Sequence, residues 1–262
     1  MSIVYELYKS RGKKVCPPNY TRVQTCPLIL RSTSEDLMTA NTFGILKNLN
    51  PHIWLKRMLS EALKTDFSRA PLNNLTFSFW KKICPPGNMT FKEGTSEVDM
   101  VIRFDQTIVL VEVKYTAPLS YYTTHGKYRN QVIRYIDVAI NNYLCDQNAH
   151  YELYLIVLTS TDKEPGIIRR YRRSQNIFRE ITRSNFFIDY AKACNDFCTR
   201  IGWINWNRLR RILEESRDCF KYEIEQKFID DLTIYLKQKE HEAREIIQER
   251  NGDHVQLTMN FE

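Results

Sequence analysis

Two acidic residues and one lysine, Asp99, Glu112 and Lys114, stand on neighbouring segments with the composition of β-strands. If these segments form a hairpin that turns at residues 105–106, Asp99 lies opposite Glu112 with the two Cβ atoms about 5 Å apart. Lys114 is two residues beyond Glu112 and therefore shares its face of the sheet. The convergence requires a turn of even length, because an odd one would disturb the register.

Such a cluster has a use in metal-dependent hydrolysis. The segment of Glu112 and Lys114 is otherwise apolar, so burying these charges costs several kcal/mol unless they are paired or bound to metal. Two carboxylates suit Mg²⁺ or Mn²⁺, which can polarise a phosphodiester and lower the pKa of a bound water. A nearby lysine can orient that water or stabilise transition-state charge. The alternative is a Glu112–Lys114 surface pair at a strand end, with Asp99 near a turn.

The elements around this cluster predict an α/β fold with a mixed central sheet flanked by helices. Apolar periodicity and helix-start signals predict helices, and apolar runs rich in β-branched residues predict strands. The expected helices span residues 34–49, 52–64 and 130–144, and the expected strands span 75–84, 98–104, 107–114 and 153–159. From about Phe186 onward the chain is expected to be helical. The expected organisation is an N-terminal extension (1–30), a core (31–185) and a helical C-terminal region packed on that core (186–262).

Asp99 followed by Glu112-Val113-Lys114 resembles the motif of the PD-(D/E)XK nuclease superfamily, also called restriction-endonuclease-like. That motif is an acidic residue on one strand and then (D/E)-x-K on the next. Val98 replaces the proline that usually precedes the aspartate. The resemblance implies a restriction-endonuclease-like core and a hydrolase that uses Mg²⁺ or Mn²⁺ to cleave phosphodiesters, in DNA rather than RNA. It leaves endonuclease and exonuclease activity equally open.

Gln131 and Tyr135 reproduce the Gln-x-x-x-Tyr element of RecB-like and Cas4-like members. Their spacing places both on one helix face, and in that group they help to hold the site and the nucleic-acid backbone. The resemblance also implies an acidic residue from the first core helix, for which Glu35 is favoured and Glu61 competes. Glu97 is the alternative to Asp99. The implied catalytic set is Glu35, Asp99, Glu112, Lys114, Gln131 and Tyr135, and the implied metal set is Glu35, Asp99, Glu112 and Val113.

Basic residues outside this cluster are candidates for nucleic-acid binding. Four arginines surround one tyrosine after the last expected strand of the core, and further basic residues precede Gln131. Arginine with an interleaved aromatic residue suits phosphate contacts and base stacking, although a solvated basic loop has the same composition. A net charge of +7 and a pI near 9.0 favour a polyanionic partner. The expected contacts are Arg169, Arg170, Tyr171, Arg172, Arg173, Lys127 and Arg129.

The remaining features restrict partners and cofactors. No segment has 18 consecutive apolar residues and the N-terminus lacks a signal peptide, so no membrane partner is expected. The seven cysteines are irregularly spaced, which indicates reduced thiols in the cytoplasm and does not fit the four-cysteine iron–sulfur cluster of some RecB-like members. The expected roles are cellular defence, repair or a mobile element. The helix from Glu214 could pack on the core, form a homodimer or join a larger nuclease complex. A second hypothesis is a catalytically inactive nucleic-acid-binding or assembly subunit that retains the nuclease fold.

Overall fold

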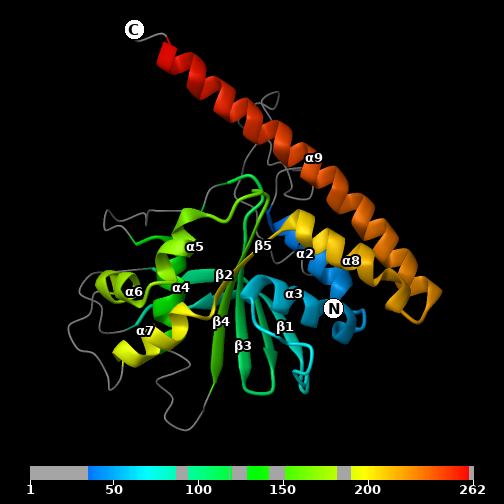
Figure 1. Cartoon of the computed structure of the whole chain (residues 1–262), viewed down its shortest axis with the longest axis horizontal. Helices are drawn as coiled ribbons and strands as arrows, with labels where there is room; N and C mark the ends of the chain where they lie inside the picture. The colour runs from blue at the N-terminus through cyan, green and yellow to red at the C-terminus, as the bar shows by residue number, and fades with distance from the viewer. Residues whose placement is uncertain are drawn as a thin grey trace, which may run out of the picture.

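A five-stranded mixed sheet forms the centre of the fold (Figure 1). The computed structural model describes residues 35–86, 94–117, 119, 129–141, 151–181 and 190–259, without the side chains of residues 190 and 249–259. The strands lie side by side in chain order; the first three are antiparallel and the last three are parallel. They are β1 (Thr76–Ile83), β2 (Ser96–Phe104), β3 (Thr107–Val113), β4 (Glu152–Thr159) and β5 (Ile201–Asn205).

Helices cover both faces of the sheet, and each face has its own apolar core. Because strand residues alternate between faces, β3 sends Val109 and Val111 into one core and Ile108 and Leu110 into the other. The first core includes α2 (Glu35–Leu46), α3 (Pro51–Leu63), α8 (Trp206–Ser216) and α9 (Glu223–Met259). The second includes α4 (Gln131–Ala139), α5 (Gly166–Tyr171), α6 (Ser174–Glu180) and α7 (Tyr190–Cys198). A 3-10 turn, η3 (Arg217–Cys219), precedes α9.

The hairpin of β2 and β3 has the register that the sequence predicts. Phe104 pairs with Thr107, and pairing continues outward to Met100 and Val111. The two-residue turn is possible because Asp105 adopts a left-handed backbone with φ 46°. The backbone pairs end at Met100 and Val111, and the next contact is made by the Asp99 side chain, which accepts from the backbone N–H of Val113.

The predicted α/β class with a mixed sheet and flanking helices is confirmed, as are the strands of the core. The expectation that only helices follow Phe186 is wrong, because β5 pairs with β4 and extends the sheet. The expected division after residue 185 therefore separates strands that share one sheet. The extension 1–30 and the helix start at Ser34 lie outside the described residues.

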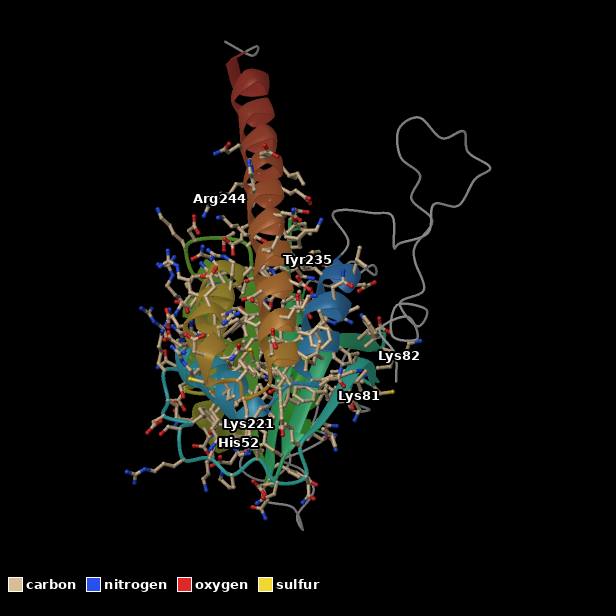
Figure 2. All side chains as sticks on the ribbon, turned by 90° about the vertical axis from the view of Figure 1, so that its right-hand side faces the viewer. His52, Lys81, Lys82, Lys221, Tyr235 and Arg244 are labelled. Carbon is tan, nitrogen blue, oxygen red and sulfur yellow. The ribbon has the colours of Figure 1, made fainter. Side chains whose placement is uncertain are left out.

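The long helix α9 is part of the fold for about half of its length. Ile229, Leu232, Leu236 and Ala243 are buried in the first core, which shows that α9 packs on the body as expected. Beyond that contact the helix rises past the sheet, as Figures 1 and 2 show. Among the described residues, no helix is both long and apolar enough to cross a membrane.

Figure 2 also shows β1 at the edge of the sheet, where it carries Lys81 and Lys82. Charged side chains on an edge strand discourage pairing with a strand of another molecule. The other edge is β5, which lies against α3 so closely that the position of Gly202 has no room for a side chain. A Cβ there would lie 2.5 Å from the backbone oxygen of Ala62 and 2.8 Å from its carbonyl carbon.

We expect Gly202→Ala to destabilise the protein by about 1–3 kcal/mol, because α3 and β5 must move apart. For a chain of this size, the melting temperature should fall by about 2–4 °C for each kcal/mol. Differential scanning calorimetry measures the change. Gly166→Ala is the matched control, since its Cβ would have only a flexible arginine atom at 4.0 Å. Equal melting temperatures for the two variants would contradict the close approach of α3 and β5.

Candidate active site

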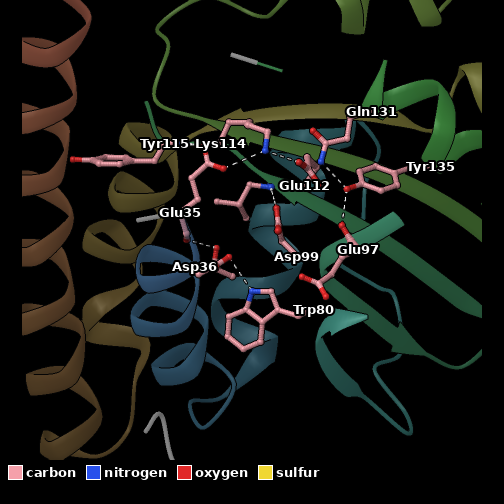
Figure 3. A network of polar contacts seen from close by, with 12 residues as sticks. Glu35, Asp36, Trp80, Glu97, Asp99, Glu112, Lys114, Tyr115, Gln131 and Tyr135 are labelled. Atoms are coloured by element: carbon pink, nitrogen blue, oxygen red, sulfur yellow. Dashed lines mark hydrogen bonds and ion pairs between the residues drawn. The ribbon is translucent and has the colours of Figure 1, made fainter. Parts of the chain in front are cut away.

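The polar cluster predicted from the sequence lies at the end of β3, where β2, α2 and α4 meet (Figure 3). Asp99 projects from β2, and one of its carboxylate oxygens accepts a hydrogen bond of 2.7 Å from the backbone N–H of Val113. Burial raises the pKa of Asp99 well above its ordinary range, and the nearby charge of Glu112 raises it further. The two carboxylates therefore lie close enough to disfavour simultaneous ionisation.

Glu112 is the most deeply buried charge of this cluster, with 0% of the residue exposed. Lys114 Nζ lies 2.8 Å from Oε1 of Glu112 and is a charged donor to this buried carboxylate. Burial raises the pKa of Glu112, while the charge of Lys114 acts in the opposite direction. A buried carboxylate with unused acceptor positions is costly by itself and is suited to a further cationic partner.

Lys114 connects two acidic residues from different elements. Its Nζ lies 2.8 Å from Glu112 Oε1 and 3.2 Å from Glu35 Oε2. Burial alone lowers the pKa of Lys114, but the charges of Glu112, Glu35 and Asp99 together outweigh it and the pKa is raised. The amine is therefore protonated at neutral pH and acts as a donor.

The structure distinguishes between the two candidates for the acid of the first core helix. Glu35 begins α2, pairs with Lys114, and also accepts a hydrogen bond of 3.1 Å from the backbone N–H of Tyr115. Glu61 instead forms an ion pair with Arg208 of α8. Glu35 is thus the acid that reaches the cluster, as the sequence analysis favoured.

Asp36 and Trp80 also adjoin the cluster, and sequence reasoning assigned neither of them to it. The indole N–H of Trp80 donates to Asp36 at 3.2 Å, which leaves Glu35 as the α2 acid that faces Lys114. Trp80 has φ 49°, a left-handed backbone that costs a bulky residue about 1–3 kcal/mol. It falls between the pairs of β1 and β2 that flank Asp99. The adjacency of Asp36 to Glu35 was the only sequence signal, because no local pattern predicts positive φ at tryptophan.

Gln131 and Tyr135 meet on one face of α4, as their spacing predicts. Gln131 Nε2 donates to the Tyr135 hydroxyl at 2.8 Å, and that hydroxyl donates to the backbone oxygen of Glu97 at 2.7 Å. The two side chains thus fasten α4 to the strand that carries Asp99. Glu97, the alternative to Asp99, is exposed and joins this network through its backbone.

The candidate cluster fits a divalent cation in its donor chemistry. Asp99 and Glu112 supply hard oxygen atoms, and the carboxylate of Glu112 keeps acceptor positions that its ion pair with Lys114 does not fill. Within the described residues, no group of three or more His, Cys, Asp or Glu side chains is already arranged to hold a metal ion. Val113 follows Glu112, and its side chain is buried in the first core, so it could offer a cation only its backbone oxygen.

The arginines around Tyr171, which the sequence analysis named as candidates for phosphate contacts with a solvated loop as the alternative, do not lie in a loop. They belong to α5 and its C-terminal end, and Tyr171 is 0% exposed. The Tyr171 hydroxyl is hydrogen-bonded to Asn130 and Glu180, so its ring is not available to stack on a base. Tyr171 lies on the apolar face of this short helix, so its side chain packs into the second core.

All four arginines around Tyr171 are exposed, but two of them pair with carboxylates. Arg170 forms an ion pair with Glu180. Arg172 pairs with Glu164 at 2.6 Å and lines an open cavity of about 480 Å³ beside β5.

Arg129 does not face solvent. It is 5% exposed, and its guanidinium lies 2.7 Å from the fully buried Asp137 of α4. A buried ion pair of this kind leaves no surface for a phosphate, so Arg129 is a structural residue in this fold. Lys127 lies outside the described residues.

Comparisons with protein-family profiles, with curated proteins and with solved structures find no match to this chain. The geometry of the cluster therefore carries the functional argument.

We expect Asp99→Asn to stabilise the metal-free protein at pH 8. The amide can still accept from Val113, while the repulsion with Glu112 and the burial of one charge are removed. Because the pKa of Asp99 is raised on folding, the wild type gains stability as the pH falls through that raised value toward the ordinary carboxyl range. The variant lacks this gain.

Thermal unfolding in EDTA at pH 8 and pH 5 measures the effect. The variant should melt about 2–4 °C higher for each kcal/mol gained at pH 8, and the difference should narrow at pH 5. A variant that melts below wild type at pH 8, or by the same margin at both pH values, would contradict a strained carboxylate pair.

Proposed function

We propose that this chain is a metal-dependent nuclease that hydrolyses phosphodiester bonds in DNA, on a restriction-endonuclease-like core. The observation that carries the proposal is the fully buried carboxylate of Glu112, which lies beside the carboxylate of Asp99 and is paired with Lys114 at 2.8 Å. A surface pair with no catalytic role would not require complete burial. The mixed sheet and the contact between Gln131 and Tyr135 support the same conclusion.

Each residue of the cluster would have its own role in such a reaction. Asp99 and Glu112 would hold Mg²⁺ or Mn²⁺, with Glu35 and Val113 as the further ligands that the resemblance implies. When bound, this ion supplies charge that polarises a phosphodiester and acidifies water.

Lys114 supplies a fixed positive charge. Its amine is held between Glu112 and Glu35 and remains protonated, so it can donate to the attacking water or to a phosphate oxygen but cannot accept the proton of that water. Charge that is already oriented before the reaction stabilises a developing anion without reorganisation. Gln131 and Tyr135 hold β2 against α4, which keeps Asp99 in place.

The substrate class follows from charge as well as chemistry. The chain has a net charge of +7, and Arg169 and Arg173 remain exposed on the α5 side. A basic surface attracts a polyanion, and the cluster described above suits its phosphodiester. DNA rather than RNA follows from the superfamily resemblance.

We expect purified protein to cleave DNA in Mg²⁺ or Mn²⁺ and not in EDTA. Asp99→Asn and Lys114→Ala should each slow cleavage by about 10²–10³-fold, the usual effect of removing one preorganised charge. Linear and circular DNA, followed by gel electrophoresis, also distinguish exonuclease from endonuclease products.

Glu97→Gln is the matched control, because it removes an exposed carboxylate from the same strand while its backbone contact to Tyr135 remains. It should cleave at the wild-type rate. An inactive wild type in both metals would overturn the proposal. So would full activity of Lys114→Ala.

We expect the double change Arg169→Ala and Arg173→Ala to weaken DNA binding several-fold without changing cleavage chemistry. Each arginine that contacts a phosphate contributes about one unit to the slope of log affinity against log salt. Fluorescence anisotropy over a salt series in Ca²⁺ measures that slope. The control is Lys221→Ala with Lys227→Ala, which removes the same charge near the start of α9, where both lysines are exposed. An equal loss in both double variants would show that net charge alone sets affinity.

A further inference from the structure

Lys114 and Tyr115 lie just beyond the end of β3, so the sheet ladder does not fix their position by itself. The last residue of β3 is Val113, and no helix or strand includes residues 114–117. The backbone N–H of Lys114 donates to the backbone oxygen of Leu158 in β4 at 2.7 Å. The remaining support for this short segment comes from side chains of distant elements.

Trp206 holds the backbone of Lys114 from one side. Its indole N–H donates to the Lys114 carbonyl oxygen at 3.2 Å, and the residue is 1% exposed at the start of α8. An indole nitrogen is a donor only, and most buried indole N–H groups have an acceptor. The ring position is set by packing in the first core, so the carbonyl of Lys114 has a rigid partner.

Tyr115 anchors the other end of the same segment through two hydrogen bonds, one from its backbone and one from its hydroxyl. Its backbone N–H donates to Glu35 at 3.1 Å, while its hydroxyl donates to the backbone oxygen of Lys239 in α9 at 2.7 Å. Figure 3 shows the ring pointing away from the cluster toward α9. Burial raises the pKa of Tyr115, with the charge of Glu242 as the next cause, so the hydroxyl keeps its proton.

We propose that Tyr115 and Trp206 are positioning residues that fix Glu35 and Lys114 at the candidate active site, so that α8 and α9 form part of its architecture. This inference rests on the nuclease function proposed above. Neither side chain touches the reacting atoms. Each acts through the Lys114–Tyr115 backbone. Trp206 donates to the carbonyl oxygen of Lys114, and Tyr115 donates from its own backbone N–H to Glu35.

The test uses two conservative variants of the full-length protein, Tyr115→Phe and Trp206→Phe. The first deletes one oxygen atom, and the second removes the indole N–H. Each has a matched control in the same fold. Tyr154→Phe deletes a hydroxyl that donates to Glu152 at the far end of β4. Trp54→Phe removes a buried indole whose nitrogen has no hydrogen-bond partner among the described residues, so it reports packing loss alone.

Three measurements separate positioning from stability. Isothermal titration with Mn²⁺ reports the site without catalysis, cleavage of a DNA duplex reports kcat and KM, and thermal unfolding reports the fold. We expect Tyr115→Phe and Trp206→Phe to bind Mn²⁺ about five- to tenfold more weakly, the effect of losing one buried hydrogen bond. They should lower kcat by a similar factor with KM unchanged. Tyr154→Phe and Trp54→Phe should keep wild-type Mn²⁺ affinity and kcat even where their melting temperatures fall.

The outcomes distinguish this inference from the proposed function. A wild type that neither binds Mn²⁺ nor cleaves DNA overturns both. A functional wild type whose Tyr115→Phe variant binds Mn²⁺ and cleaves like Tyr154→Phe overturns the positioning role alone. If Trp206→Phe fails to fold, Tyr115→Phe decides the result, because removing one hydroxyl leaves the packing of the ring intact.

Discussion

Glu112 places a fully buried carboxylate beside Asp99, and the amine of Lys114 pairs with it at 2.8 Å. Burial and the charge of Glu112 raise the pKa of Asp99. The charges of Glu112, Glu35 and Asp99 hold the amine of Lys114 protonated in spite of burial. Glu35 then reaches the same amine from α2. The network has more acid than base: three carboxylates surround one ammonium, so a cation is the partner that would balance it.

Two unfavourable features of this fold lie at that network. Asp99 and Glu112 repel each other, and Trp80 adopts a left-handed backbone between the pairs that flank Asp99. Two apolar cores, one on each face of the sheet, offset these terms. Backbone strain of this kind persists only where the surrounding structure imposes it. The strained backbone of Trp80 lies at the same end of β3 as the buried charges.

The sequence predicted this cluster because short segments of the chain determine the geometry of the cluster. A two-residue turn and a run of β-branched residues fix the hairpin, and i, i+4 spacing fixes the Gln131–Tyr135 contact. Predictions from the sequence were wrong where packing between distant segments determines the structure. β5 is only five residues long, which is too short for a periodic signal, and Tyr171 and Arg129 are buried by helices that no local pattern places over them. The left-handed backbone of Trp80 was unpredictable for the same reason.

The order of elements along the chain gives a last constraint. The cluster takes Glu35 from near the start of the described chain, while the hydroxyl of Tyr115 binds the backbone of Lys239 in the final helix. These two contacts span 80 and 124 residues of sequence, and their loop-closure entropy must be offset by packing elsewhere. The face of α9 that carries Leu232 and Leu236 supplies part of that packing. The position of the Lys114–Tyr115 segment beside the cluster therefore depends in part on how α9 packs against the body of the fold.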